Sequence, residues 1–109
     1  TRIFLCLEVV DFRRGIDGLA AVCRNLLSQD PLGGALFAFK NRRGTAVKLL
    51  VHDGQGFWLM QKRLSQGTFG WWPKNALEAQ GLTHHQLQVL LANGDPMGAK
   101  IAPAWKKVS

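Results

Sequence analysis

The sequence predicts an α+β fold: an antiparallel β-meander of about four to five strands packed against an N-terminal amphipathic helix, with a short C-terminal helix. Two observations predict this class. Short apolar segments alternate with turn residues between positions 36 and 72, and apolar residues recur at three- and four-residue intervals between positions 16 and 27. At 109 residues with 47% hydrophobic content, the chain suits one domain. We expect that domain over residues 1–94, followed by an irregular basic tail over residues 95–109.

The first elements are a strand and a helix. Residues 3–10 are apolar except for Glu8, which is typical of a buried or half-buried strand. We expect the helix to begin at Asp11, whose carboxylate can cap the first turn, and to end before Pro31. Cys6 and Cys23 lie in apolar surroundings, so we expect buried, reduced thiols.

The middle of the chain predicts the sheet. Four strand-like segments are separated by turns rich in Gly, Asn, Asp and Ser, and they cover residues 36–40, 47–52, 57–63 and 68–72. Sequential strands with short links form an antiparallel meander, of which the helix should cover one face. A capping box formed by Thr83 and Gln86 predicts the start of the C-terminal helix, and Asn93 with Gly94 predicts its end.

Positive charge is concentrated in the predicted hairpin. The chain has 14 basic and 7 acidic residues, a formal net charge of +7 and a pI near 10.1. Most of that excess lies within residues 40–63, which favours an anionic partner such as nucleic acid. The alternative is a solvated turn that keeps a sheet edge soluble. The candidate nucleic-acid-binding residues are Lys40, Arg42, Arg43, Lys48, Lys62 and Arg63.

No group of residues has a spacing typical of a catalytic or metal site. Asp11, Asp17 and Asp53 could gather at a two-metal nuclease site, although Asp11 has a capping role available and Asp53 lies in a turn. His84 and His85 are adjacent and would point about 100° apart on a helix, so they cannot chelate one ion together. We therefore expect no catalytic residue, metal or cofactor.

The tryptophans allow two interpretations. Trp58, Trp71 and Trp72 could stack on single-stranded bases, but paired aromatic residues in a small sheet more often contribute to the core. We expect at least two of the three in the core. No apolar segment approaches the roughly 18 residues needed to span a bilayer, so we expect a cytoplasmic protein without membrane contact.

Several motifs together resemble the TnpB-type accessory proteins of bacterial insertion sequences in family sixty-six, which are distinct from the RNA-guided nucleases of the same name. The resemblance covers nearly the whole chain, and its motifs lie at residues 11–20, 37–44, 53–57, 62–64 and 93–96. It implies a small protein, encoded beside a separate transposase and needed for efficient transposition. It implies no catalytic residues.

The leading hypothesis is therefore a non-enzymatic accessory protein of DNA transposition. It would bind DNA, including the terminal repeats of its element, through phosphate contacts from the basic hairpin, and it would assist the transposase. Such a protein would associate with the bacterial nucleoid. The alternative is a protein adaptor that binds the transposase through an open sheet face or the helix over 83–92, without DNA contact. A homo-oligomer is compatible with both hypotheses.

Overall fold

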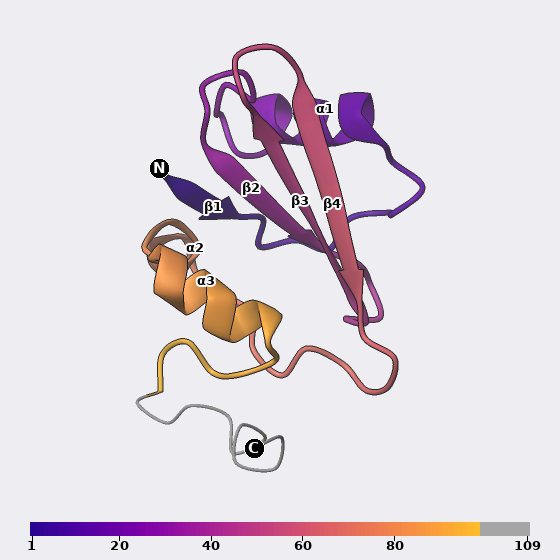
Figure 1. Cartoon of the computed structure of the whole chain (residues 1–109), viewed down its shortest axis with the longest axis vertical. Helices are drawn as coiled ribbons and strands as arrows, with labels where there is room; N and C mark the ends of the chain where they lie inside the picture. Colours follow the sequence, from indigo (N-terminus) through magenta and orange to yellow (C-terminus); the bar gives the residue numbers. More distant parts are fainter. Residues whose placement is uncertain (99–109) are drawn as a thin grey trace.

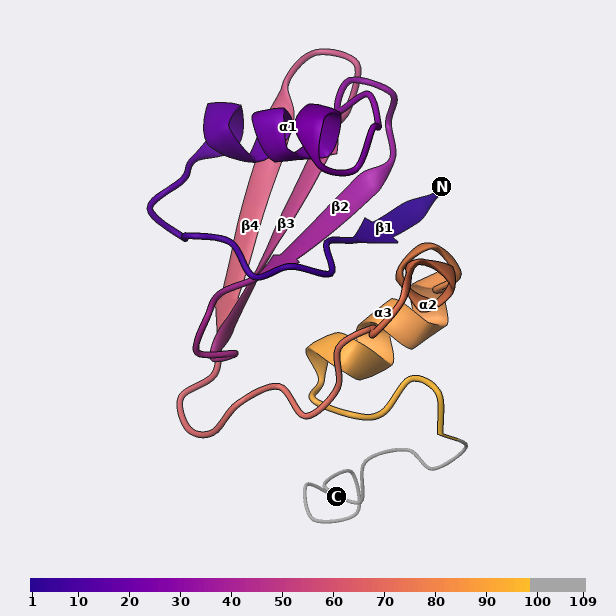
Figure 2. The same ribbon diagram turned by 180° about the vertical axis from the view of Figure 1, so that it is seen from behind.

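A four-stranded mixed sheet lies between helices on its two faces. The computed structural model describes residues 1–98, and its strands follow the order β1-β2-β3-β4. Helix α1 covers one face, and α2 and α3 lie against part of the other (Figures 1 and 2). The elements are β1 (Ile3–Leu5), α1 (Ile16–Asn25), β2 (Leu36–Lys40), β3 (Ala46–His52), β4 (Phe57–Arg63), α2 (Ala76–Gln80) and α3 (His84–Leu91).

Strand β1 runs parallel to β2, so the prediction of a purely antiparallel sheet was wrong. Ile3 pairs with Leu36 and Leu5 with Ala38, in the same direction. The physical reason is the connection between the two strands. After β1 the chain passes over one face of the sheet as α1 and then enters β2, and a helical crossover of this kind makes the next strand run in the same direction. The strand is also shorter than predicted, since pairing ends at Leu5.

Strands β2, β3 and β4 form the predicted antiparallel meander, which the pairings confirm. The predicted strand over residues 68–72 is a loop instead. Its backbone is held by other partners: Phe69 N donates to the carbonyl of Gly44 at 2.8 Å, and Gly70 N donates to Asn93 Oδ1 at 2.8 Å. These bonds join the loop to the turn between β2 and β3 and to the segment after α3 rather than to β4, which remains an edge strand.

The start of the first helix differs from the prediction. Helix α1 begins at Ile16, with Gly15 at the N-cap and no side-chain cap. Asp11 caps nothing, because its carboxylate accepts hydrogen bonds from the backbone and guanidinium of Arg13. The residues between Asp11 and Gly15 form a separate loop that precedes the helix.

The C-terminal helices are fixed by side-chain caps. The predicted capping box of α3 is confirmed: Gln86 N donates to Thr83 Oγ1, and Thr83 N donates to Gln86 Oε1. Asn93, rather than Gly94, takes the left-handed conformation after the helix, with φ of 64°. The short helix α2 was not predicted, although Asn75 caps it by accepting from Glu78 N at 2.9 Å.

Two apolar clusters lie on opposite faces of the sheet. One joins Phe37 and Phe39 to α1, and it buries Cys6 and Cys23 as free thiols whose pKa is raised by burial, to about 12 for Cys23. The other joins Ala38 and the opposite face to α2 and α3. Of the predicted tail, residues 99–109 lie outside the described residues. Within residues 1–98, no helix is long and apolar enough to cross a membrane.

Candidate nucleic-acid interface

The turn between β2 and β3 holds two exposed arginines on a fixed backbone. Asn41 Oδ1 accepts from the backbone N–H of Thr45 at 2.9 Å and of Ala46 at 3.1 Å, so this side chain closes the turn. Gly44 has a φ of +70°, which an L residue rarely adopts. Arg42 and Arg43 lie between these residues and are exposed to solvent. The local sequence thus fixes the turn backbone while leaving both guanidinium groups free to reach a ligand.

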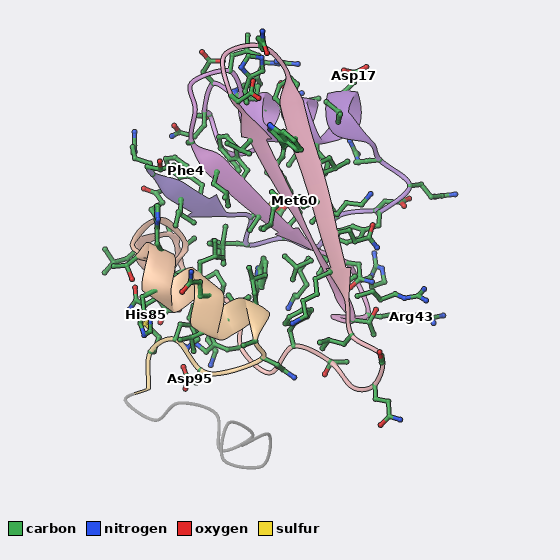
Figure 3. The ribbon with its side chains drawn as sticks, viewed as in Figure 1. Phe4, Asp17, Arg43, Met60, His85 and Asp95 are labelled. Carbon is green, nitrogen blue, oxygen red and sulfur yellow. The ribbon has the colours of Figure 1, made fainter. Side chains whose placement is uncertain are left out.

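A second loop lies beside this turn. Val10 N donates to the carbonyl of Lys40 at 3.0 Å, which brings the segment before α1 alongside the end of β2. Between the two loops is an open cleft lined by Val9, Val10, Asp11, Phe12, Arg13, Asn41, Arg42 and Arg43. Figure 3 labels Arg43 at this end of the sheet. Three guanidinium groups from two separate segments therefore border one surface.

Lys48 holds the second loop in place. Its Nζ donates to the carbonyl oxygens of Phe12 and Arg14, each at 2.9 Å, and lies 4.9 Å from the centre of the Phe12 ring. The residue is only 7% exposed, and it is the one charged residue among the buried side chains of residues 1–98. A buried ammonium needs such partners, because an unpaired one is strongly disfavoured. Lys48 therefore ties the sheet to the loop and has little access to an external phosphate.

Arg13 was not among the predicted contact residues, which all lie within residues 40–63. Its side chain is 91% exposed and its guanidinium pairs with Asp11, with Arg13 Nη2 at 2.6 Å from Asp11 Oδ2. Hydrogen bonds from the side chain and backbone of Arg13 lower the pKa of Asp11 to about 2. The pair of adjacent arginines at positions 13 and 14 was visible in the sequence. Only the fold places Arg13 beside the same cleft as Arg42 and Arg43.

The remaining predicted residues surround the same end of the sheet without all entering the cleft. Lys40 is half-buried, with Nζ 5.3 Å from the centre of a Trp72 ring, and burial lowers its pKa. Lys62 is exposed, and its Nζ donates to the carbonyl of Leu91 at 2.5 Å. Arg63 is exposed and pairs across the sheet with Ala46, at the start of β3.

The aspartates of the nuclease hypothesis have local roles. Asp53 accepts hydrogen bonds from the backbone N–H groups of Gln55 and Gly56 and from Trp58 Nε1, and these bonds lower its pKa to about 2. Asp11 is paired with Arg13. Within residues 1–98, no group of three or more His, Cys, Asp or Glu residues could hold a metal ion.

The fold and this surface together define a small α+β protein with a basic cleft at one end of its sheet. The chain belongs to the family described as IS66 Orf2 like protein, which it matches over residues 1–100. Membership implies an accessory role associated with transposition.

Two relatives come from Sinorhizobium fredii, and both carry the name of an uncharacterized protein. The protein y4hO is 36% identical over 94 residues, which cover 86% of this chain and 81% of the relative. The protein y4jC is 38% identical over 68 residues, which cover 62% of this chain and 58% of the relative. No solved structure matches the chain.

Proposed function

We propose that this protein is a non-enzymatic accessory factor of insertion-sequence transposition that binds DNA through its basic cleft. The observation that carries the proposal is the convergence of Arg13, Arg42 and Arg43 from two loops that are tied to the sheet. Guanidinium groups form charge-assisted, bidentate hydrogen bonds with phosphates. A surface of this kind suits the phosphate backbone and supports a role at the DNA of the element.

The proposed contact residues differ slightly from those suggested by the hairpin alone. Arg13, Arg42 and Arg43 would bind phosphates in the cleft, and Arg63 would extend the surface along β4. Lys62 retains two N–H donors beyond its bond to Leu91. It would therefore add a phosphate contact on the face of the sheet that points away from α1. Lys40 and Lys48 are left with supporting roles because they are half-buried and buried, respectively.

The test is the salt dependence of DNA binding. The double variant Arg42→Ala/Arg43→Ala should bind duplex DNA more weakly, and the slope of log K against log salt should fall by up to about two units, because about 0.9 counterion is released per phosphate contact. A matched control, Arg24→Ala/Lys74→Ala, removes the same charge from exposed positions outside the cleft. If both variants lose affinity equally, the attraction is a general effect of net charge and the cleft is not the site. Duplexes with terminal repeats and scrambled duplexes would be compared to measure specificity.

A second candidate function is that of an adaptor for the transposase. The observation that favours it is a narrow apolar groove between the end of α1 and helix α2, lined by Phe4, Leu5, Leu27, Ala76 and Ala79 among others. Leu26, which also lines the groove, is 48% exposed, and Leu77 of helix α2 is 84% exposed. An exposed cluster of this kind is typical of a protein contact.

The adaptor hypothesis is tested by co-purification with the transposase from nuclease-treated lysate. The variant Leu26→Asp, which places a charge on a residue that lines the groove, should weaken association while leaving DNA binding unchanged, since the groove is distinct from the cleft. Retained association would exclude the groove as the contact.

A further inference from the structure

Strand β4 presents an aromatic side chain on an uncovered part of the sheet. Alternate residues of β4 point to opposite faces, and Phe57 and Leu59 pack toward α1. Trp58 and Met60 point to the other face, where they are 59% and 44% exposed. In Figures 1 and 3 no helix crosses the part of β4 where Met60 is labelled. The carbonyl of Leu91, the last residue of helix α3, accepts a hydrogen bond from Nζ of Lys62 near the end of this strand.

Trp58 differs from every other aromatic residue among residues 1–98. It is the one Phe or Trp side chain in this part of the chain that is largely exposed, whereas Trp72 is buried and Trp71 packs against the core. Its indole Nε1 donates to Asp53 Oδ2 at 2.8 Å, so the ring is held in one orientation on the surface. An indole ring fixed in this way can receive a stacked base at a lower entropic cost than a freely rotating side chain.

The exposed ring lies on the face of the sheet opposite the cleft, and edge strand β4 links the two at its basic end. Along β4, Trp58 is followed on the same face by Met60 and Lys62, and Arg63 ends the strand. Arg63 pairs with Ala46 directly after the turn that carries Arg42 and Arg43. Arg63 lies five positions after Trp58 in the strand, which corresponds to about 17 Å. A nucleic acid held at the basic end of the sheet can therefore extend along β4 to this ring.

We propose that the uncovered face of β4 binds single-stranded DNA, with an unpaired base stacked on Trp58 and the backbone directed along Lys62 toward the basic cleft. This inference rests on the proposed function, because it takes the ligand of the cleft to be DNA. A single strand is favoured over a duplex because its bases offer their flat faces, which are hidden in a stacked helix. The neighbouring Asp53 is engaged by three N–H donors, which offset its charge locally.

The test compares Trp58→Ala and Trp58→Phe for binding to a labelled 20-nucleotide thymidine strand and to a duplex of equal length. Loss of stacking should weaken single-strand affinity about tenfold in Trp58→Ala, while Trp58→Phe retains most of it. The salt slope should be unchanged, because a stacked base releases no counterions. Duplex affinity should also be unchanged, since Trp58 lies outside the cleft. Circular dichroism would check that both variants remain folded.

Several outcomes would overturn the inference. Unchanged single-strand affinity in Trp58→Ala would remove Trp58 from the site. An equal loss of affinity for single-stranded and duplex DNA would mean that Trp58 has no specific role in binding single strands. If light scattering showed a wild-type dimer that Trp58→Ala converts to a monomer, the face would be a protein contact instead. Duplex binding without single-strand binding by the wild-type protein would overturn this inference alone, whereas no binding to either would overturn the proposed function as well.

Discussion

The ammonium group of Lys48 lies 2.9 Å from the carbonyl oxygen of Phe12, a residue 36 positions earlier in the chain. The same group bonds to the carbonyl of Arg14, so one side chain of β3 holds the loop that carries Arg13. By charge alone, Lys48 belongs with the other basic residues of the hairpin. In the structure it instead fixes the position of the loop that forms one side of the cleft.

Replacing Lys48 with Met should destabilise the protein. The variant keeps the aliphatic chain but leaves two carbonyl oxygens without their charged donor, and hydrogen bonds to charged groups contribute about 1.5–3 kcal/mol each. We expect the free energy of unfolding in urea to fall by about 2 kcal/mol. Amide hydrogen exchange at Arg13 and Arg14 should accelerate as the loop loosens. The control is Lys74→Met at an exposed position, which should have little effect on the free energy of unfolding. Equal stabilities for the two variants would mean that the bonds from Lys48 to the loop do not stabilise the protein.

Replacing Gly44 with Ala should also destabilise the protein, but for a backbone reason. An added Cβ would meet Thr68 Cβ at 3.8 Å, which is ordinary contact, so the cost comes from the φ of +70°. That conformation costs an L residue about 1–2 kcal/mol. The control is Gly56→Ala, since Gly56 has no positive φ and an added Cβ would meet no atom within 4 Å. Urea unfolding of both variants checks the expectation, which fails if Gly56→Ala is the more damaging change.

Replacing Asp11 with Asn should strengthen DNA binding. Asp11 neutralises the exposed guanidinium of Arg13, and a neutral side chain would leave that charge available to a phosphate. The affinity should rise, and the slope of log K against log salt should steepen by up to about one unit. Fluorescence anisotropy at several salt concentrations measures both quantities. A weaker affinity would instead indicate that the carboxylate positions Arg13 for binding.

Asp53 should titrate at an unusually low pH. Its three hydrogen bonds favour the charged form and lower its pKa from 3.8 to about 2. Because the folded-state pKa lies below that of the unfolded chain, the resulting stabilisation is present above about pH 4 and is lost as the pH falls through about 2. Carbon NMR of the Asp53 carboxyl should give this midpoint, and the indole N–H resonance of Trp58 should move with it. A midpoint near 4 would mean that these bonds are absent in solution.

Local chemistry explains which features could be predicted from the sequence. The capping box of Thr83 and Gln86 and the turn at Asn41 depend on residues a few positions apart, so their patterns were sufficient. The start of α1 was misplaced because Asp11 had two local partners available, and the guanidinium of Arg13 bound it instead of the helix amides. The strand predicted at residues 68–72 does not form because of a long-range contact. The Asn93 side chain hydrogen-bonds to the backbone of Thr68 and Gly70, which a strand would use for pairing.

The meander of β2, β3 and β4, the capped C-terminal helix and the concentration of positive charge could be predicted from the chain alone, because strand alternation, helix caps and charge depend on residues close together in sequence. The parallel pairing of β1, the burial of Lys48, the meeting of Arg13 with Arg42 and Arg43, and the exposure of Trp58 emerge only in the folded protein. Those outcomes depend on which distant segments pack together. Burial and pairing are properties of the packed chain, and no local pattern of residues encodes them.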